Sequence, residues 1–355
     1  MMTGYLLIKA LVLIGLLSVT LSVVSETTLA QSAPVQIIFD TDMAEDVDDV
    51  GALALLHALA DRGEAEILAT TVSARNEFVV PCLDAINTYY GRPDIPIGYV
   101  RPLESNSQIG VQGGPAPSKY AEQVAKRFPH DLKSGGDAPD AAKLHRKILA
   151  AQPDHSIVIV TVGFLTNLRD LLDSGPDEFS KLGGEALVKQ KVKLWVCMGG
   201  KFPEGLFPDG GSEYNVNFDT VSSVRAINDW PTPIVFSGFE IGARVLTGHR
   251  LNATPKEKPV RAGYFYYNGL KHRESWDQTA VLFAVRGERD YWTLSEPGFN
   301  LMHARARFGY NEWIPTPRKQ HRYLIEKMPP ANLAQVIEDL MTQPPKMREN
   351  QRRRK

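Results

Sequence analysis

An acidic cluster between two apolar runs constrains this chain more than any other feature. Residues 36–56 read QIIFDTDMAEDVDDVGALALL, and six of the ten residues from Asp40 to Asp49 are acidic, with no Lys or Arg among them. At about 4 Å, two like charges repel by roughly 1 kcal/mol in water and about 4 kcal/mol near a protein surface. The cluster therefore needs protons or a cation, and oxygen-only ligands favour Ca²⁺ or Mg²⁺. We expect the cation, and a solvated acidic loop that caps a helix is the alternative.

The local pattern predicts a strand, a loop and a helix around this cluster. Residues two apart on a strand share a face, so Asp40 and Asp42 at the end of VQIIF can both point into one site. Asp48 and Asp49 then enter that site from the following helix. A helix N-terminus favours an anion by only about 0.3–1 kcal/mol, which is less than the repulsion it would have to offset.

The rest of the chain predicts an α/β fold with a mostly parallel sheet flanked by helices, because apolar runs alternate with helical segments. Further strands are expected at 67–72, 95–100, 156–163, 192–200 and 233–240, and helices at 81–91, 140–152, 166–175 and 220–229. Polar or glycine residues follow most of these strands, and open α/β sheets bind ligands at that edge, so we expect one site there. The C-terminal third, with helices at 276–285 and from 329 onward, is expected to add helices to the same domain.

The N-terminal segment reads as a signal peptide over residues 1–30. Lys9 precedes an uncharged run from Ala10 to Val24, and Thr28-Leu29-Ala30 offers a small-residue cleavage site. The protein is therefore expected to be secreted or periplasmic. An uncleaved anchor is the alternative, although the run is short for a membrane span of about 20 residues.

Charge and cysteine usage limit the partners. The formal net charge is -1, and the last ten residues hold six cations and one Glu, so the rest of the chain is near -6, which argues against a nucleic-acid surface. Residues 35–342 are expected to form the domain and 343–355 a basic disordered tail. No stable membrane association is expected after processing, and a homo-oligomer is compatible with the sequence. Cys82 and Cys197 read as two buried thiols, with a disulfide as the alternative.

At the acidic cluster the chain resembles the inosine-uridine nucleoside hydrolase family, whose opening motif is DxDxxxDD on a strand, a loop and a helix. Here the motif reads DTDMAEDVDD, which is two residues longer, with Met43-Ala44 at the place of the usual Pro-Gly. Aligning the pair before the helix gives Asp48 and Asp49 the double-Asp places, with Asp46 as a rival. The resemblance implies a Rossmann-like nucleoside hydrolase fold.

Three further segments carry the resemblance, which covers most of residues 36–285. VGFLTNL, at 162–168, is similar to the family's T-G-P-L-T-N segment, whose metal-binding backbone carbonyl falls at Val162. The triplet Glu213-Tyr214-Asn215 after Met-Gly-Gly is similar to one that binds ribose hydroxyls. SWDQTAVLFAVRG, at 275–287, resembles a late helix whose Asp is a metal ligand, here Asp277.

The residue before Asp277 departs from the family pattern. Many members have a His there, near the leaving base, whereas this chain has Trp276. An indole cannot donate a proton as an imidazole can, but its face can stack on a purine. His272, Tyr266 and Tyr267 are alternative acids, although structural roles suit them better.

The resemblance implies an enzyme that hydrolyses the N-glycosidic bond of a nucleoside or related N-riboside to ribose and free base, with Ca²⁺, or alternatively Mg²⁺, as cofactor. It assigns the metal to Asp42, Asp49, Asp277 and the Val162 carbonyl, with Asp42 also accepting the proton of the attacking water. It assigns the substrate to Asp48, Asn76, Glu213, Asn215 and Trp276.

Two other functions remain open at this point. A haloacid-dehalogenase-like phosphatase would use the DxD of IIFDTDM, but it leaves the Glu-Tyr-Asn triplet and Asp277 unexplained. A secreted Ca²⁺-dependent nucleoside- or sugar-binding protein without turnover is favoured by Ala44 and by the absent His.

Overall fold

The first strand of the sheet is buried on both faces. β1 (Val35–Thr41) has Ile37, Ile38 and Phe39 fully buried, which is the pattern of a strand in a parallel sheet covered by helices. The computed structural model describes residues 33–101, 117–305 and 308–346, and in it the loop after β1 leads into α1 (Asp48–Asp61). The expected strand, loop and helix are present. The proposed signal peptide and most of the proposed tail lie outside the described residues.

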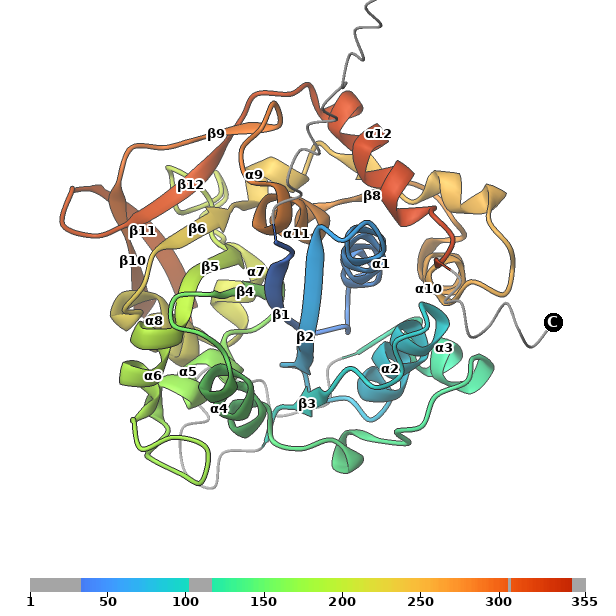
Figure 1. The fold of residues 1–355 in the computed structure, drawn as a ribbon. Helices are drawn as coiled ribbons and strands as arrows, with labels where there is room; N and C mark the ends of the chain where they lie inside the picture. Colours follow the sequence, from blue (N-terminus) through green and yellow to red (C-terminus); the bar gives the residue numbers. More distant parts are fainter. Residues whose placement is uncertain (1–32, 102–116, 306–307, 347–355) are drawn as a thin grey trace, which may run out of the picture. The chain divides into compact units, whose positions relative to one another are not determined.

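Within the described residues, ten strands form one sheet in the order β11-β10-β12-β6-β5-β4-β1-β2-β3, with β9 paired to β12 (Figure 1). The strands from β3 across to β12 pair in parallel, which confirms the predicted fold class. The chain runs from β1 outward to β3 on one side and from β4 outward to β6 on the other, so the topology switches between β1 and β4. Ligands of open α/β sheets bind at such a switch point. The parallel strands after β1 are β2 (Ala65–Val72), β3 (Ile97–Tyr99), β4 (Ile157–Thr161), β5 (Val192–Met198), β6 (Ile234–Ser237) and β12 (His321–Glu326).

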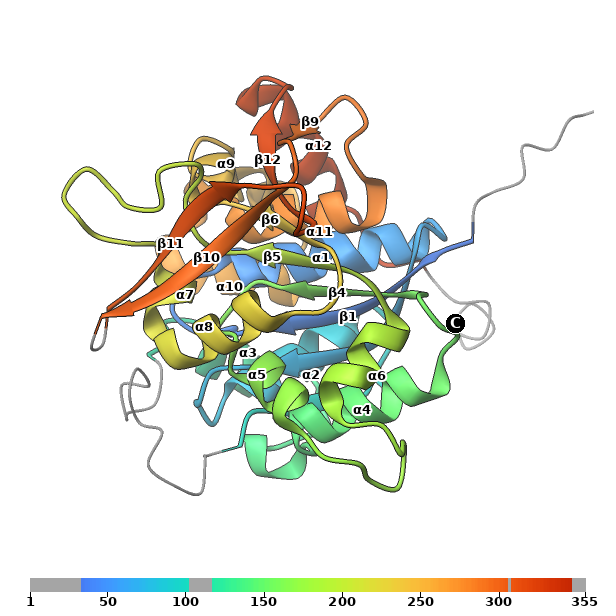
Figure 2. The same ribbon diagram turned by 90° about the vertical axis from the view of Figure 1, so that its left-hand side faces the viewer.

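Helices cover both faces of the sheet (Figures 1 and 2). Neighbouring residues Ile37 and Ile38 belong to opposite core clusters because successive strand side chains point to opposite faces. One cluster includes α1, α2 (Val79–Tyr89), α10 (Pro259–Asn268), α11 (Trp276–Arg286) and α12 (Pro330–Met341), and the other includes α4 (Ala141–Ala151), α5 (Thr166–Asp173), α6 (Gly184–Lys191) and α8 (Thr220–Asp229). The remaining elements are α3 (Ala121–Arg127), α7 (Tyr214–Phe218), α9 (Phe239–Gly242), the two-stranded pair β7 (Leu246–Thr247) and β8 (Arg273–Glu274), and the 3₁₀ turns Gly135–Asp137 and His249–Ala253.

The C-terminal third differs from the expectation that it adds only helices. It also contributes β9 (Trp292–Leu294), β10 (Gly298–Arg305) and β11 (Phe308–Pro315), which join the sheet as antiparallel strands beside β12. Burial alternates along most of β10, as it does on a strand with one face packed against helices.

The segment at residues 212–219, which contains the Glu213-Tyr214-Asn215 triplet, is helical in part. Tyr214–Phe218 form the short helix α7, and the Glu213 side chain accepts the backbone N–H groups of Asn215 and Val216 at its start. Asp219 caps α8 in the same way through Ser222. The acidic side chains therefore begin two successive helices here.

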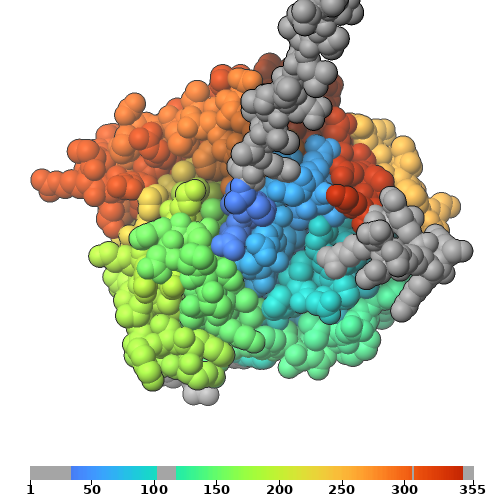
Figure 3. Space-filling model, in the orientation of Figure 1, coloured from blue at the N-terminus to red at the C-terminus, as the bar shows by residue number. Residues whose placement is uncertain are grey.

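The two ends of the described chain lie side by side. α12 packs beside α1 (Figures 1 and 3), and the Arg62 guanidinium after α1 donates to the Gln343 side chain at 2.8 Å. Cys82 and Cys197 are buried and free, so neither forms a disulfide. Among the described residues, no helix is both long enough and apolar enough to span a membrane.

Candidate active site

A cavity of about 270 Å³ opens at the carboxyl edge of the sheet, next to the switch point. It collects residues that follow β1, β4 and β6 and the last residue of β5, so the expectation of one convergent site holds for these strands. The lining residues are Asp42, Glu45, Asp46, Asp48, Asp49, Val162, Met198, Phe207, Ser212, Glu213, Tyr214, Asn215, Phe239, Arg273, Trp276 and Asp277.

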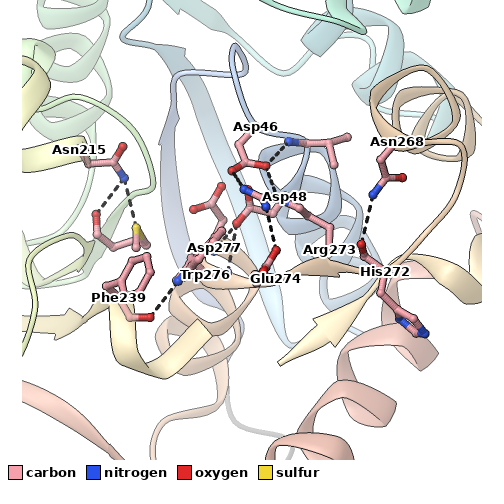
Figure 4. Close-up of polar contacts among 12 residues, drawn as sticks. Asp46, Asp48, Asn215, Phe239, Asn268, His272, Arg273, Glu274, Trp276 and Asp277 are labelled. Carbon is pink, nitrogen blue, oxygen red and sulfur yellow. Dashed lines mark hydrogen bonds and ion pairs between the residues drawn. The ribbon is translucent and has the colours of Figure 1, made fainter. Parts of the chain in front are cut away.

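Three buried carboxylates meet at one end of this cavity. Oxygen atoms of Asp48, Asp49 and Asp277 all lie within 4.8 Å of one another, close enough to hold one metal ion. Asp48 Oδ2 also accepts the backbone N–H groups of Trp276 at 3.1 Å and Asp277 at 3.2 Å (Figure 4). The start of α1 thereby caps the start of α11, which joins two segments more than 200 residues apart.

Asp42 and Asp49 are oriented by the turn between β1 and α1. Asp49 Oδ1 accepts the Thr41 hydroxyl and the Met43 backbone N–H, the latter at 3.1 Å. Asp42 Oδ1 accepts the Ala44 backbone N–H at 3.3 Å. The predicted Val162 carbonyl borders the same cavity. The resemblance assigns the metal to the carboxylates of Asp42, Asp49 and Asp277. In the structure, the three carboxylates that lie within 4.8 Å of one another are those of Asp48, Asp49 and Asp277.

The carboxylates oppose one another electrostatically at this end of the cavity. Burial, together with repulsion from the neighbouring acids Asp46 and Asp48, raises the pKa of Asp42 to about 8. Burial and then mutual repulsion hold the pKa of Asp48, Asp49 and Asp277 well above the usual range. No Lys is among the described residues that line the cavity. A buried set of oxygen-only donors with no ammonium partner fits a hard divalent cation.

Gly163 allows the end of β4 to approach the acidic loop closely. A Cβ at this position would lie 2.5 Å from the Asp42 backbone nitrogen and 2.8 Å from the Asp42 Cβ. Real Cβ atoms do not approach backbone this closely, so any larger residue would push the loop away. The place of the Val162 carbonyl beside the acids therefore depends on this glycine.

The predicted sugar-binding residues lie next to the carboxylates. Both oxygens of Glu213 accept backbone N–H groups, from Asn215 at 2.9 Å and from Gly200 at 3.0 Å, among others. Asn215 donates its amide to the carbonyls of Val162 and Met198, each at 3.3 Å. Glu213 therefore caps α7 and holds the Gly200 backbone, whereas the carbonyl oxygen of the Asn215 amide remains available.

Beside the carboxylates, the cavity is lined by aromatic side chains and, among its described lining residues, by one cation. Trp276 donates its indole N–H to the Phe239 carbonyl at 2.8 Å, and the two rings lie 5.3 Å apart. The Arg273 guanidinium lies 4.9 Å from the centre of the Trp276 ring and pairs with both oxygens of Asp46 (Figure 4). Asp46, the rival for a double-Asp place, is thus directed to Arg273 and not to Asp49 or Asp277.

Several candidates from the sequence do not line the cavity. Asn76 accepts the Phe78 backbone N–H at 2.9 Å, near the start of α2. Asp40 is buried beneath the site, where it accepts the Thr71 hydroxyl at 2.5 Å and the Asn167 amide at 2.7 Å, so Asp40 and Asp42 do not share one site as expected. Strand alternation holds within β1, but Asp42 lies beyond its last residue, where the turn redirects the side chain.

One of the alternative acids lies beside the cavity, because the Tyr267 ring is 5.6 Å from the Arg273 guanidinium and the Tyr267 hydroxyl bonds to Asp46. None of His272, Tyr266 and Tyr267 is among the lining residues, and the His272 imidazole points away from Arg273 and Trp276 (Figure 4).

Sequence reasoning missed Arg273, Glu45 and Tyr214. The Tyr214 hydroxyl bonds to Glu45, and both line the cavity. The two extra residues of the acidic motif were the only available signal. Because this longer loop contains Glu45 and Asp46, it reaches partners on both sides of the cavity.

Comparison with known proteins defines the class. The parallel sheet with an acidic site at its switch point is that of an N-glycosyl hydrolase of the nucleoside hydrolase type. The family model described as inosine-uridine preferring nucleoside hydrolase matches residues 37–304, and the chain belongs to this family. No curated protein sequence matches the chain.

Solved structures share the fold at low identity. A plant nucleoside hydrolase, PpNRh1, aligns with a TM-score of 0.65 and 18% identity over 88% of this chain and 100% of its own. The inosine-uridine preferring nucleoside hydrolase of Bacillus anthracis aligns with a TM-score of 0.64 and 17% identity over 86% and 99%. The purine-preferring ribonucleoside hydrolase of Gardnerella vaginalis aligns with a TM-score of 0.61 and 15% identity over 86% and 98%.

Proposed function

We propose that this protein is a metal-dependent hydrolase that cleaves the N-glycosidic bond of free ribonucleosides. The observation that carries the proposal is the convergence of Asp48, Asp49 and Asp277 within 4.8 Å, with Asp42 on the same cavity. These acids come from opposite ends of the domain, and their shared site is explained by a cation that needs all of them. Ca²⁺ is the preferred ion because buried carboxylate and carbonyl oxygens suit its flexible coordination, and Mg²⁺ is the alternative.

The residues around the cavity have distinct roles in this proposal. Asp42, Asp49, Asp277 and the Val162 carbonyl would hold the ion, with Asp48 turning to the ribose. When bound, the ion acts as a Lewis acid and lowers the pKa of water in the site. Asp42 accepts the proton that this water loses as it attacks the anomeric carbon. The carboxylates stabilise the positive charge that develops on the sugar.

The sugar and the base would occupy neighbouring parts of the cavity. The Asn215 amide oxygen and Asp48 hold the ribose hydroxyls, and the base lies against Trp276 and Phe239. Asn76 could contribute to the ribose only if the segment around it moved toward the cavity.

An uncharged nucleoside suits this cavity better than a phosphorylated one. Among the described residues that line it, seven carboxylates face a single Arg, so even with a divalent ion this lining stays negative and repels phosphate. One structural neighbour, the effector protein XopQ, is described as complexed with adenosine diphosphate ribose and aligns at 14% identity and a TM-score of 0.60. We propose no such ligand for this chain. The N-terminal segment supports export, so the substrate would be an extracellular or periplasmic nucleoside.

The position of Asp40 weighs against the phosphatase alternative. That mechanism needs the first Asp of the DxD motif as an exposed nucleophile, whereas Asp40 is fully buried and hydrogen-bonded to Thr71 and Asn167.

The test is release of ribose and free base from a panel of purine and pyrimidine nucleosides. The full chain is assayed as isolated, after EGTA treatment, and after Ca²⁺ or Mg²⁺ is restored. We expect cleavage that EGTA abolishes and one of the two ions restores. Nucleoside binding by calorimetry without any ribose release would identify a binding protein instead. Cleavage that persists after complete metal removal would contradict the metal-dependent mechanism.

A further inference from the structure

The hydrogen-bond donors of the cavity are almost all engaged within the protein. Among the described lining residues, the side-chain donors are Ser212, Tyr214, Asn215, Arg273 and Trp276. Ser212 donates to the Gly309 carbonyl at 2.6 Å, Tyr214 bonds to Glu45, and Trp276 donates to the Phe239 carbonyl. The Asn215 amide is shared between two carbonyls. Four of these five donors are therefore already hydrogen-bonded within the protein and are poorly placed to donate to a departing base.

Arg273 is the exception. A guanidinium has five N–H groups. Asp46 accepts from Nε at 2.7 Å and from one terminal nitrogen, and Glu274 accepts from the other at 2.8 Å. Three N–H groups are thus engaged and two remain. The Asp46 and Glu274 carboxylates also hold the planar guanidinium in one orientation, so little side-chain entropy is lost when it binds a ligand.

The location of Arg273 matches the place of the base. Its guanidinium lies 4.9 Å from the Trp276 ring and 5.6 Å from the Tyr267 ring, and it lines the cavity. Trp276 directly precedes Asp277, which belongs to the carboxylate trio. A ribose held at the carboxylates therefore places its base beside Trp276 and within reach of this guanidinium.

We propose that Arg273 is the catalytic residue that stabilises the leaving base, by hydrogen bonds to an acceptor atom of the base on which negative charge develops. This inference rests on the proposed function. The bond from C1′ to the base nitrogen breaks, and its electron pair stays on the base. Water supplies hydroxide to C1′ and its proton to Asp42, from which a proton reaches the departed base through solvent. Arg273 remains protonated throughout, because its pKa lies far above the working range.

A comparison of two substrates tests this role. Inosine needs stabilisation of its leaving base, whereas p-nitrophenyl β-D-ribofuranoside carries a leaving group that departs readily as an anion. For Arg273→Met we expect kcat on inosine to fall about 10²–10³-fold, as for removal of one preorganised donor, while kcat on the nitrophenyl riboside changes much less. Arg273→Lys keeps the charge and should recover part of the loss.

Two controls keep the test decisive. Arg273→Met leaves the Asp46 carboxylate without its partner, and the double variant Asp46→Asn/Arg273→Met removes that charge. The double variant should show the same result, a large fall of kcat on inosine and a small one on the nitrophenyl riboside. Arg244→Met removes an exposed guanidinium outside the cavity and should leave both rates unchanged.

The outcomes separate this inference from the proposed function. Equal losses on both substrates would show that Arg273 only supports the fold and would overturn the inference. A fall of kcat/KM for adenosine, which has no titrating proton between about pH 7 and 9, would also overturn it if it occurred in that range, since such a fall indicates a titrating acid on the enzyme and not an arginine. A wild-type protein that cleaves neither substrate in the presence of Ca²⁺ or Mg²⁺ would instead overturn the proposed function itself.

Discussion

Two neighbouring parts of the cavity are built in different ways. The acidic floor (Asp42, Asp48, Asp49 and Asp277) is buried and is held mainly by backbone N–H groups and the Thr41 hydroxyl. The base rim (Phe207, Tyr214, Phe239, Arg273 and Trp276) is more exposed, with Tyr214 at 42%, and is held largely by contacts among its own side chains and with Glu45 and Asp46. On the proposed function, we expect the floor to tolerate little change without loss of the reaction and the rim to vary with the base that is bound.

The largest effect is expected at the floor, from Asp277→Asn. Loss of one carboxylate removes a ligand and should lower kcat/KM by at least about 10³-fold, because a metal ion supplies several kcal/mol of transition-state stabilisation. The same change removes a repelling buried charge, so the metal-free protein should become more stable to heat. Kinetics with Ca²⁺ and thermal unfolding in EGTA measure the two effects.

Asp339→Asn is the matched control, because that carboxylate is exposed on α12 and pairs with Arg250 on the surface. If Asp277→Asn were as active as this control, the floor would not be the site of metal binding.

The next effect is the pH dependence of the metal-free protein. The folded-state pKa of Asp42 is raised from 3.8 to about 8, and those of Asp48, Asp49 and Asp277 are also raised. A raised carboxyl pKa contributes stability below the unfolded value and loses it as pH rises through the folded value. Stability in EGTA should therefore fall between about pH 4 and 8.

Ca²⁺ should reverse this trend, with a stabilisation that grows over the same pH range because ionised ligands bind it. Thermal unfolding at several pH values, with and without Ca²⁺, measures both curves. A metal-free protein that becomes more stable over this range would show that the acids are already neutralised by other groups.

A third effect tests the distance between β4 and the floor. In Gly163→Ala the new Cβ would meet the Asp42 backbone, and overpacking of this kind costs about 1–3 kcal/mol. We expect reduced unfolding free energy and weaker Ca²⁺ binding. Gly175→Ala is the control, because a Cβ added there would have no atom within 4 Å and its backbone is not left-handed. If Gly163→Ala and Gly175→Ala had the same unfolding free energy and the same affinity for Ca²⁺, the floor would tolerate a shift of β4.

The smallest effect is expected at the rim, from Tyr214→Phe. The ring keeps its contacts with Phe164 and Phe218, and only the hydroxyl bond to Glu45 is lost. A bond at a half-exposed position contributes about 0.5–1.5 kcal/mol, so KM should rise several-fold at most while kcat is kept. A large fall in kcat would show that the Glu45 loop positions the floor as well as the rim.

The sequence allowed the parallel part of the fold to be predicted because both signals are local. Apolar runs of strand length alternate with helical segments between Val35 and Ser237, and each strand needs only its own pattern to be recognised. The antiparallel strands β10 and β11 were missed because their apolar and polar residues alternate weakly, although the two strands are neighbours in the chain and pair with each other. The helix at Tyr214 was missed for a related reason, since Glu213 favours a helix start only when nearby N–H groups face it.

For the site, the acidic motif by itself determined that a cation or protons must lie at the end of the first strand, because six acids in ten residues repel one another wherever they fold. It did not determine which acids meet. Only the tertiary structure decided that Asp46 turns to Arg273, that Asp48 and Asp49 meet Asp277, and that Asp40 lies beneath the site. The first two choices depend on contacts between segments more than 200 residues apart, and the third on a contact between residues 127 positions apart. Short-range patterns in a chain carry no information on which distant segment will complete a site.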